Sequence, residues 1–160
     1  MFGLRETDMN IYLIDDLGDS GEYAGFLMAH RAVLPQFTLH IFTHLQALLD
    51  AIHTQMPDVL LADMRFDNIP LSQLYGDIQG LAQTEAFCGN FERAEAQVRG
   101  MQGLLICRAL RAEHIPIPII LFASLPPSII EHVSQTLAPI HIIEGLILKH
   151  VKTILEGIAR

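Results

Sequence analysis

The sequence predicts a doubly wound α/β domain built around a parallel sheet. Short apolar runs alternate with amphipathic stretches along the chain, as expected when each strand is followed by a helix. The apolar runs are continuous rather than alternating with polar residues, which indicates strands covered on both faces, as in parallel sheets. The length of 160 residues suits one domain with a core of ordinary size, so we predict a single domain over 1–160.

Five apolar runs are predicted to be buried strands, because they are short and are bounded by polar or turn-forming residues. They cover residues 10–16, 37–44, 58–64, 115–123 and 139–143. The third run, "DVLLADM", shows the pattern most clearly, since apolar residues fill it until it meets Asp63. A strand that buries its side chains should end near a charge, so Asp63 is expected at the end of this strand.

Amphipathic stretches with helical spacing separate these strands and close the chain. The predicted helices cover residues 20–34, 45–56, 103–114, 128–138 and 146–159. Ser20 is the expected N-cap of the first helix. Pro57 lies just beyond the second helix, where a proline commonly follows a helix end.

One segment, residues 66–99, breaks the alternation between the third strand and the third helix. It is too long for an ordinary strand-to-helix connection. Apolar residues recur in it at intervals of three and four, first from Leu74 to Leu81 and then from Phe87 to Val98. We therefore predict a helical insert of two short amphipathic helices, broken near Gly89.

Composition and charge exclude several classes of protein. The net charge of −8, with no run of basic residues, argues against direct binding of nucleic acid, which needs clustered Lys and Arg. The longest apolar runs are too short to span a bilayer, and the N-terminus lacks the pattern of a signal peptide. Cys88 and Cys107 form no metal-binding spacing. We expect a reduced cytoplasmic protein with no membrane partner.

Three acids stand at the predicted ends of two strands. Asp15 and Asp16 end the first strand, and Asp63 ends the third. In a flavodoxin-like five-stranded sheet of order 2-1-3-4-5 these strands are neighbours, and ligands bind at their carboxyl ends. Each acid alone could be a solvated or capping residue. Three converging carboxylates cannot all stay ionised without a cation or proton, and Mg²⁺ suits such a site. A carboxylate beside Mg²⁺ can also attack phosphorus and form an acyl phosphate.

The order of three short motifs resembles the receiver domain of bacterial response regulators in two-component signalling. The motifs are "YLIDD", "DVLLADMR" and, beyond the insert, "GMQGLLICRALR", and the resemblance covers residues 9–158 apart from the insert. It implies that Asp63 is the phosphoacceptor and that Asp16 and Asp63 bind Mg²⁺ directly. It also implies that Asp15 acts through water and that the backbone carbonyl of Arg65 completes the protein ligands.

The residues that would contact a phosphoryl group depart from the family pattern. The family carries Ser or Thr after the fourth strand, and gap-free alignment puts Ala123 there, with Ser124 one position later. The family carries Lys after the fifth strand. If "PIHII" is that strand, Glu144 takes the place of the lysine and His141 that of a switching aromatic residue. If "GLILKH" is the strand instead, Lys149 is the lysine, but a long helix then contains a proline. We prefer the first assignment.

We expect a stand-alone receiver-like protein, because the sequence ends at Arg160, directly after the last predicted helix. The resemblance implies that it accepts a phosphoryl group on Asp63 with Mg²⁺ and signals by protein–protein contact. The donor would be a histidine kinase or a phosphotransfer protein. The downstream protein target is unknown, and a homodimer is left open. The contact surface would be the last two helices and the fifth strand. We expect no enzymatic activity beyond self-dephosphorylation.

Two other functions stay open. The first is a pseudo-receiver, an atypical interaction module that is not switched by phosphorylation, which Ala123 and Glu144 favour. The second is a phosphatase with Asp63 as nucleophile, although Arg65 stands where such enzymes typically carry a second Asp. The insert begins at the rim of the acid site, so we hypothesise that it forms a lid or a protein-contact surface.

Overall fold

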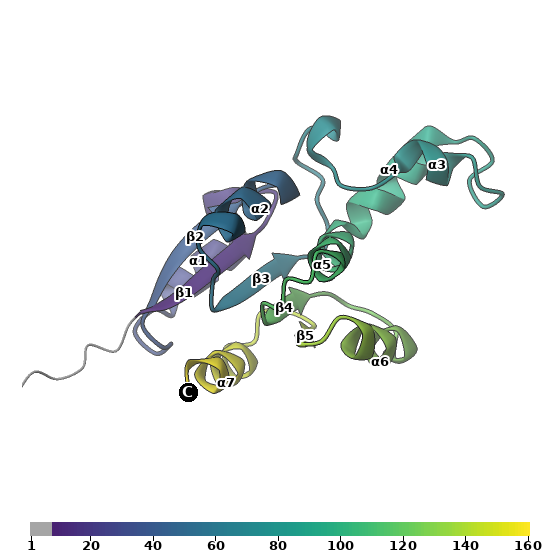
Figure 1. Ribbon diagram of the computed structural model, residues 1–160. Coiled ribbons are helices and arrows are strands. Elements are labelled where there is room, and N and C mark those ends of the chain that lie inside the picture. The colour runs from purple at the N-terminus through teal and green to yellow at the C-terminus, as the bar shows by residue number, and fades with distance from the viewer. Residues whose placement is uncertain (1–7) are drawn as a thin grey trace, which may run out of the picture.

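The sheet of this protein has five parallel strands in the order β2-β1-β3-β4-β5, as the computed structural model shows for residues 8–160 (Figure 1). The strands are β1 (Met9–Ile14), β2 (Phe37–Phe42), β3 (Val59–Asp63), β4 (Ile119–Phe122) and β5 (Ile140–Ile143). The five strands and the flavodoxin-like order are confirmed. The fourth strand is shorter than predicted because its run begins "IPIP", and proline has no N–H for a sheet ladder.

Helices cover both faces of the sheet, which explains why the strands are continuously apolar. The flanking helices are α1 (Glu22–Ala29), α2 (Leu45–Thr54), α5 (Gln102–Ala112), α6 (Pro127–Thr136) and α7 (Leu148–Ala159). The helices α2, α5 and α6 share one buried apolar cluster with the sheet, and α1 and α7 share the other. The strand β1 contributes to both clusters, since Ile14 packs in the first and Leu13 in the second. The sheet is therefore the middle layer of three.

The first helix differs from its prediction. Ser20 is not the N-cap but lies in a short 3-10 turn, Gly18–Ser20, where its hydroxyl donates to the carbonyl of Leu17 at 2.7 Å. Gly21 takes the N-cap position, and the helix ends at Ala29 instead of continuing to residue 34. The residues after Ala29 form turns instead, in which the N–H of Leu34 donates to the carbonyl of His30 at 3.2 Å.

The insert contains two short helices, as predicted, which are α3 (Ile78–Ala82) and α4 (Phe91–Gly100). A 3-10 turn, Leu71–Gln73, precedes them, and Gly89, with a φ of +79°, lies between them. Their buried apolar residues form a small cluster of their own, consisting of Ile78, Ala82, Ala94 and Val98. The pair projects away from the sheet, with α4 leading into α5 through Met101 (Figure 1). Within residues 8–160, no helix has the length and apolar character needed to cross a membrane.

Candidate cation and phosphoacceptor site

The three predicted acids converge at the carboxyl ends of β1 and β3. Asp15 and Asp16 directly follow β1, and Asp63 is the last residue of β3. One ligand oxygen from each carboxylate can be chosen so that the three lie within 4.8 Å of one another. Because β1 and β3 are hydrogen-bonded neighbours, the sheet itself brings the acids together. The arrangement has the oxygen donors that a hard divalent cation prefers.

Asp15 is the most buried of the three acids, with 1% of its surface exposed. Its Oδ1 accepts a hydrogen bond from the backbone N–H of Leu17 at 3.2 Å, while its Oδ2 is buried without a partner in the described part of the chain. Burial raises the pKa of Asp15 to about 7, and the neighbouring carboxylates of Asp16 and Asp63 add to this rise. An unpartnered buried carboxylate oxygen is satisfied by a proton or by a bound cation, so Asp15 fits a cation site.

The carboxylate of Asp63 is held through one of its two oxygens. Its Oδ1 accepts from the hydroxyl of Tyr23 at 3.0 Å and from the backbone N–H of Met64 at 2.8 Å. Among the described residues, no donor is hydrogen-bonded to Oδ2. Burial raises the pKa of Asp63, while these two hydrogen bonds act in the opposite direction. The free oxygen, Oδ2, is therefore the one available to a cation or an electrophile.

Asp16 connects the acid site to the insert. Its Oδ2 accepts hydrogen bonds from the backbone N–H groups of Asp67 at 2.8 Å and Asn68 at 2.9 Å, and from the side-chain amide of Asn68 at 2.8 Å. Because three donors share one oxygen of Asp16, the start of the insert, at residues 67 and 68, is held against the acids. The insert therefore reaches the site through residues 67 and 68, whereas α3 and α4 project from the sheet (Figure 1). This arrangement leaves the two helices free for a contact role.

Arg65 lies two residues after Asp63, close to the acid site along the chain. The side chain of Arg65 pairs with Asp67, with Nε and Oδ2 2.6 Å apart, and the pair is solvent-exposed. The assignment of the Arg65 carbonyl as a metal ligand stays a prediction.

The backbone after Asp63 is packed against the start of α5, where Gly103 donates its N–H to the carbonyl of Met64 at 2.9 Å. A Cβ at position 103 would overlap the backbone oxygen of Asp63, so only glycine allows this approach.

The structure decides between the two assignments of the fifth strand. β5 ends at Ile143 and Glu144 follows it, whereas Lys149 lies in α7. The preferred assignment is confirmed, and the alternative that made Lys149 the strand-end lysine is wrong. The reason is the proline expected to prevent a long helix, since Pro139 lies between α6 and β5.

At the ends of β4 and β5, a polar pair replaces the hydroxyl and the lysine of the family pattern. Ala123 follows β4 and is buried, with its N–H bonded to the carbonyl of Ile143 at 3.0 Å. Ser124 is exposed, and its hydroxyl donates to Oε1 of Glu144 at 3.1 Å. His141 is exposed on the edge strand β5. A carboxylate thus stands where the resemblance would place a cation.

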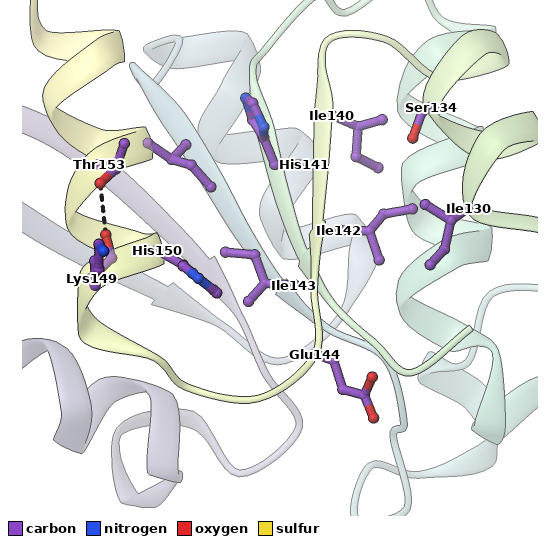
Figure 2. A pocket seen from close by; sticks show the side chains of 11 residues that line it. Ile130, Ser134, Ile140, His141, Ile142, Ile143, Glu144, Lys149, His150 and Thr153 are labelled. Carbon is purple, nitrogen blue, oxygen red and sulfur yellow. Dashed lines mark hydrogen bonds between the residues drawn. The ribbon is translucent and has the colours of Figure 1, made fainter. Parts of the chain in front are cut away.

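A groove of about 700 Å³ runs along the edge strand, between α6, β5 and α7 (Figure 2). Ile142 from β5 and Ile130 from α6 face each other on one side of the strand, and Lys149 and His150 lie on α7 at the other side. Glu144 lies at the end of β5, at the rim of this groove. The groove belongs to the surface that the sequence resemblance implies for protein contacts.

Tyr23 is the residue at this site to which sequence reasoning gave no functional role. It lies within the first predicted helix, over residues 20–34, and its hydroxyl donates to Asp63 at 3.0 Å. Its ring packs against Phe122 of β4, with centroids 4.8 Å apart. A polar-tipped aromatic residue shortly after the two acids was the available signal, because a buried tyrosine hydroxyl needs a partner.

Comparison with known proteins supports the fold. No protein-family model and no curated protein matches the chain. Among solved structures, the apo receiver domain of nitrogen regulatory protein C is similar at a TM-score of 0.58 and 16% identity, covering 98% of this chain and 96% of that one. A DNA-binding response regulator of the LuxR family from Staphylococcus aureus is similar at a TM-score of 0.58 and 11% identity, and the match covers 95% of this chain and 99% of that one. The beryllofluoride-activated receiver domain of nitrogen regulatory protein C (NtrC) is similar at a TM-score of 0.54 and 17% identity, and the match covers 96% of this chain and 95% of that one.

These likenesses define the class of fold. The chain has the flavodoxin-like fold of response regulator receiver domains, with an acidic cluster at the carboxyl ends of its strands. Identities of this size show the fold alone, so the chemistry must be argued from the site itself.

Proposed function

We propose that this protein is a receiver-type phosphoacceptor of two-component signalling, in which Asp63 accepts a phosphoryl group with Mg²⁺ as cofactor. The observation that carries the proposal is the convergence of Asp15, Asp16 and Asp63 within 4.8 Å at the strand ends of a receiver fold. The phosphodonor would be a histidine kinase or a phosphotransfer protein.

The residues present fit a magnesium ion. Asp15 has a buried oxygen without a partner, and Asp63 has one carboxylate oxygen that accepts no hydrogen bond from the described residues. These two acids and Asp16 would hold the cation, with the carbonyl of Arg65 as a further candidate ligand. When bound, Mg²⁺ would neutralise the acids and draw the negative charge of the phosphoryl oxygens.

The transfer step requires a nucleophilic oxygen and a leaving group. A carboxylate oxygen of Asp63 forms a bond to phosphorus, while the bond from phosphorus to the donor nitrogen of phosphohistidine breaks and the imidazole leaves with the electron pair. Water can later attack the acyl phosphate and release inorganic phosphate, which restores Asp63. No other turnover is proposed, so the protein would not be an enzyme in the usual sense.

The output is proposed to be a contact with another protein through α6, β5 and α7, where the edge-strand groove lies (Figure 2). Support comes from the apolar side chains that line the groove. The target protein is not identified by any feature of this surface, and function without an attached output domain stays a prediction.

The test is phosphorylation by a small donor. The protein is incubated with Mg²⁺ and acetyl phosphate, and the intact mass is measured beside that of Asp63→Asn. We expect an added phosphoryl mass on the natural protein and none on the variant. The same mass on Asp63→Asn would reject Asp63 as the acceptor.

A second function, the pseudo-receiver, is favoured by the pair formed by Ser124 and Glu144. In that case the fold serves as an interaction module, and neither acetyl phosphate nor Mg²⁺ changes its mass or stability. Rapid hydrolysis of a phosphate ester would instead indicate the phosphatase.

A further inference from the structure

The contact between Tyr23 and Asp63 has a chemical consequence for the acceptor. A carboxylate oxygen has two lone pairs in the plane of the group. Both lone pairs of Oδ1 of Asp63 accept hydrogen bonds. One donor is the hydroxyl of Tyr23, 3.0 Å away, and the other is the N–H of Met64, 2.8 Å away. Oδ1 is therefore saturated, and Oδ2 is the single oxygen left for new bonds.

The proposed phosphoryl transfer needs more than one oxygen of Asp63. One oxygen must bond to phosphorus, and the carboxylate must also serve as a ligand of the cation. With Oδ1 occupied, these two demands compete for Oδ2. The N–H of Met64 belongs to the backbone next to Asp63 and cannot move far from it, whereas the hydroxyl of Tyr23 is delivered by a side chain from α1.

Packing defines where Tyr23 rests. It is half-buried in the first turn of α1, and its ring lies against Phe122 at 4.8 Å with an angle of 37° between the ring planes. Phe122 pairs directly with Asp63 across the β3–β4 ladder. The ring is thus supported by the residue beside the acceptor, and rotation of the side chain would withdraw the hydroxyl without moving the helix.

We infer that Tyr23 is a hydrogen-bonding cap on Asp63, a positioning residue that must leave Oδ1 before the acceptor can bind a cation and phosphorus together. This inference rests on the proposed function. The cap holds the carboxylate in one orientation in the resting protein and slows its phosphorylation. Release of the cap moves the ring relative to Phe122, next to Ala123, where the chain lacks the hydroxyl of the family pattern.

The first experiment compares phosphorylation rates. Tyr23→Phe keeps the ring and its packing but deletes the donor. In Mg²⁺ and acetyl phosphate we expect the phosphoryl mass to appear faster than in the natural protein, on the order of tenfold, as for loss of one hydrogen bond to a charged group. Tyr75→Phe is the matched control, because Tyr75 is exposed and its side chain has no hydrogen bond among the described residues. An unchanged or slower rate in Tyr23→Phe, with mass still added, would overturn the cap.

A spectroscopic readout separates a cap from a merely structural tyrosine. The chain has no tryptophan and three tyrosines, so Tyr12→Phe with Tyr75→Phe leaves Tyr23 as the one emitter. Hydrogen bonding to a carboxylate quenches tyrosine emission, so we expect emission to rise when Mg²⁺ and acetyl phosphate are added. Emission that stays constant while the phosphoryl mass appears would contradict the inference.

If neither the natural protein nor Tyr23→Phe gains mass, the proposed function fails, and joint binding of Mg²⁺ and a phosphoryl mimic decides the cap separately. Titration with beryllofluoride in Mg²⁺, followed by thermal stability, makes both demands on the carboxylate and should then show Tyr23→Phe binding more tightly than the natural protein, again on the order of tenfold. Equal affinities would reject the cap.

Discussion

Asn68 donates two hydrogen bonds to the same oxygen of Asp16, from its backbone N–H at 2.9 Å and from its side-chain amide at 2.8 Å. The N–H of Asp67 adds a third donor at 2.8 Å. One carboxylate of the candidate cation site thus also fixes the start of the insert. Since Asp16 follows β1 directly and Asn68 lies beyond β3, this contact also holds two loops of the sheet together.

The side-chain part of this anchor can be removed separately. Asn68→Ala deletes one hydrogen bond to a charged acceptor and leaves both backbone donors, so we expect the free energy of unfolding to fall by about 1 to 2 kcal/mol. Urea denaturation measures the loss. Gln79→Ala, on the exposed face of α3, is the control and should change stability little. Equal stability of Asn68→Ala and the natural protein would mean that the anchor contributes nothing.

The sequence predicted the sheet and the acid cluster because both follow from local patterns. Buried strands are continuous apolar runs, and the ends of parallel strands meet at one edge, so Asp15, Asp16 and Asp63 had to converge. The two insert helices followed from apolar spacing in the same way.

The contacts that set the chemistry of the site could not be predicted. The bond from Tyr23 to Asp63 joins residues 40 positions apart, and the side-chain bond from Asn68 to Asp16 joins residues 52 apart. Each depends on side-chain directions that only the packed fold defines. Ser20 failed as a predicted N-cap for a related reason, because a 3-10 turn after the acids moved the N-cap by one residue, to Gly21.

The close approach of α5 to β3 makes Gly103 sensitive to any side chain. In Gly103→Ala the new Cβ would overlap the backbone oxygen of Asp63, so α5 or the acceptor strand must move. We expect a loss of about 1 to 3 kcal/mol, the usual cost of overpacking a well-packed site, together with slower phosphorylation. Thermal or urea denaturation measures the first effect and intact mass the second.

Gly157→Ala is the matched control for this substitution. Gly157 also lies in a helix, α7, but a Cβ there meets no atom within 4 Å. Alanine is favoured over glycine inside helices by about 1 kcal/mol, so this variant should be more stable than the natural protein. If both variants behaved alike, the overlap with Asp63 would not matter.

The raised pKa of Asp15 predicts that the free energy of unfolding falls as the pH rises. Its pKa is about 7 in the folded protein against an ordinary value of 3.8, so the folded state holds a proton that the unfolded state has released between these values. The stability from this group is fully present below about pH 4 and is lost as the pH rises through 7. Without divalent cations, we therefore expect the urea midpoint to fall between pH 5 and pH 8 more steeply than in Asp15→Asn.

Added Mg²⁺ should reverse the trend, because the cation needs the ionised carboxylate. We expect the stabilisation by Mg²⁺ to be larger at pH 8 than at pH 5.5 in the natural protein and to be small at both in Asp15→Asn. Stabilisation by Mg²⁺ that is independent of pH, or equal in the variant, would show that Asp15 does not take part in binding the cation.

Glu144 places a negative charge at the end of β5, where Ser124 donates to it. A phosphoryl group on Asp63 would add charge to a site that already holds three carboxylates. Like charges repel, and because Glu144 is exposed, solvent and salt weaken this repulsion without removing it. Glu144→Gln removes one unit of repulsion, and Glu144→Lys replaces it with attraction.

The steady-state level of phosphorylation, measured by intact mass with limiting acetyl phosphate, should therefore rise from the natural protein to Glu144→Gln and again to Glu144→Lys. The differences should shrink in 1 M salt, where screening shortens the range of the field. Lys149→Gln changes the charge by one unit on α7 instead and should leave the level unchanged. Equal levels in Glu144→Gln and Glu144→Lys would mean that charge at the end of β5 does not act on the acceptor.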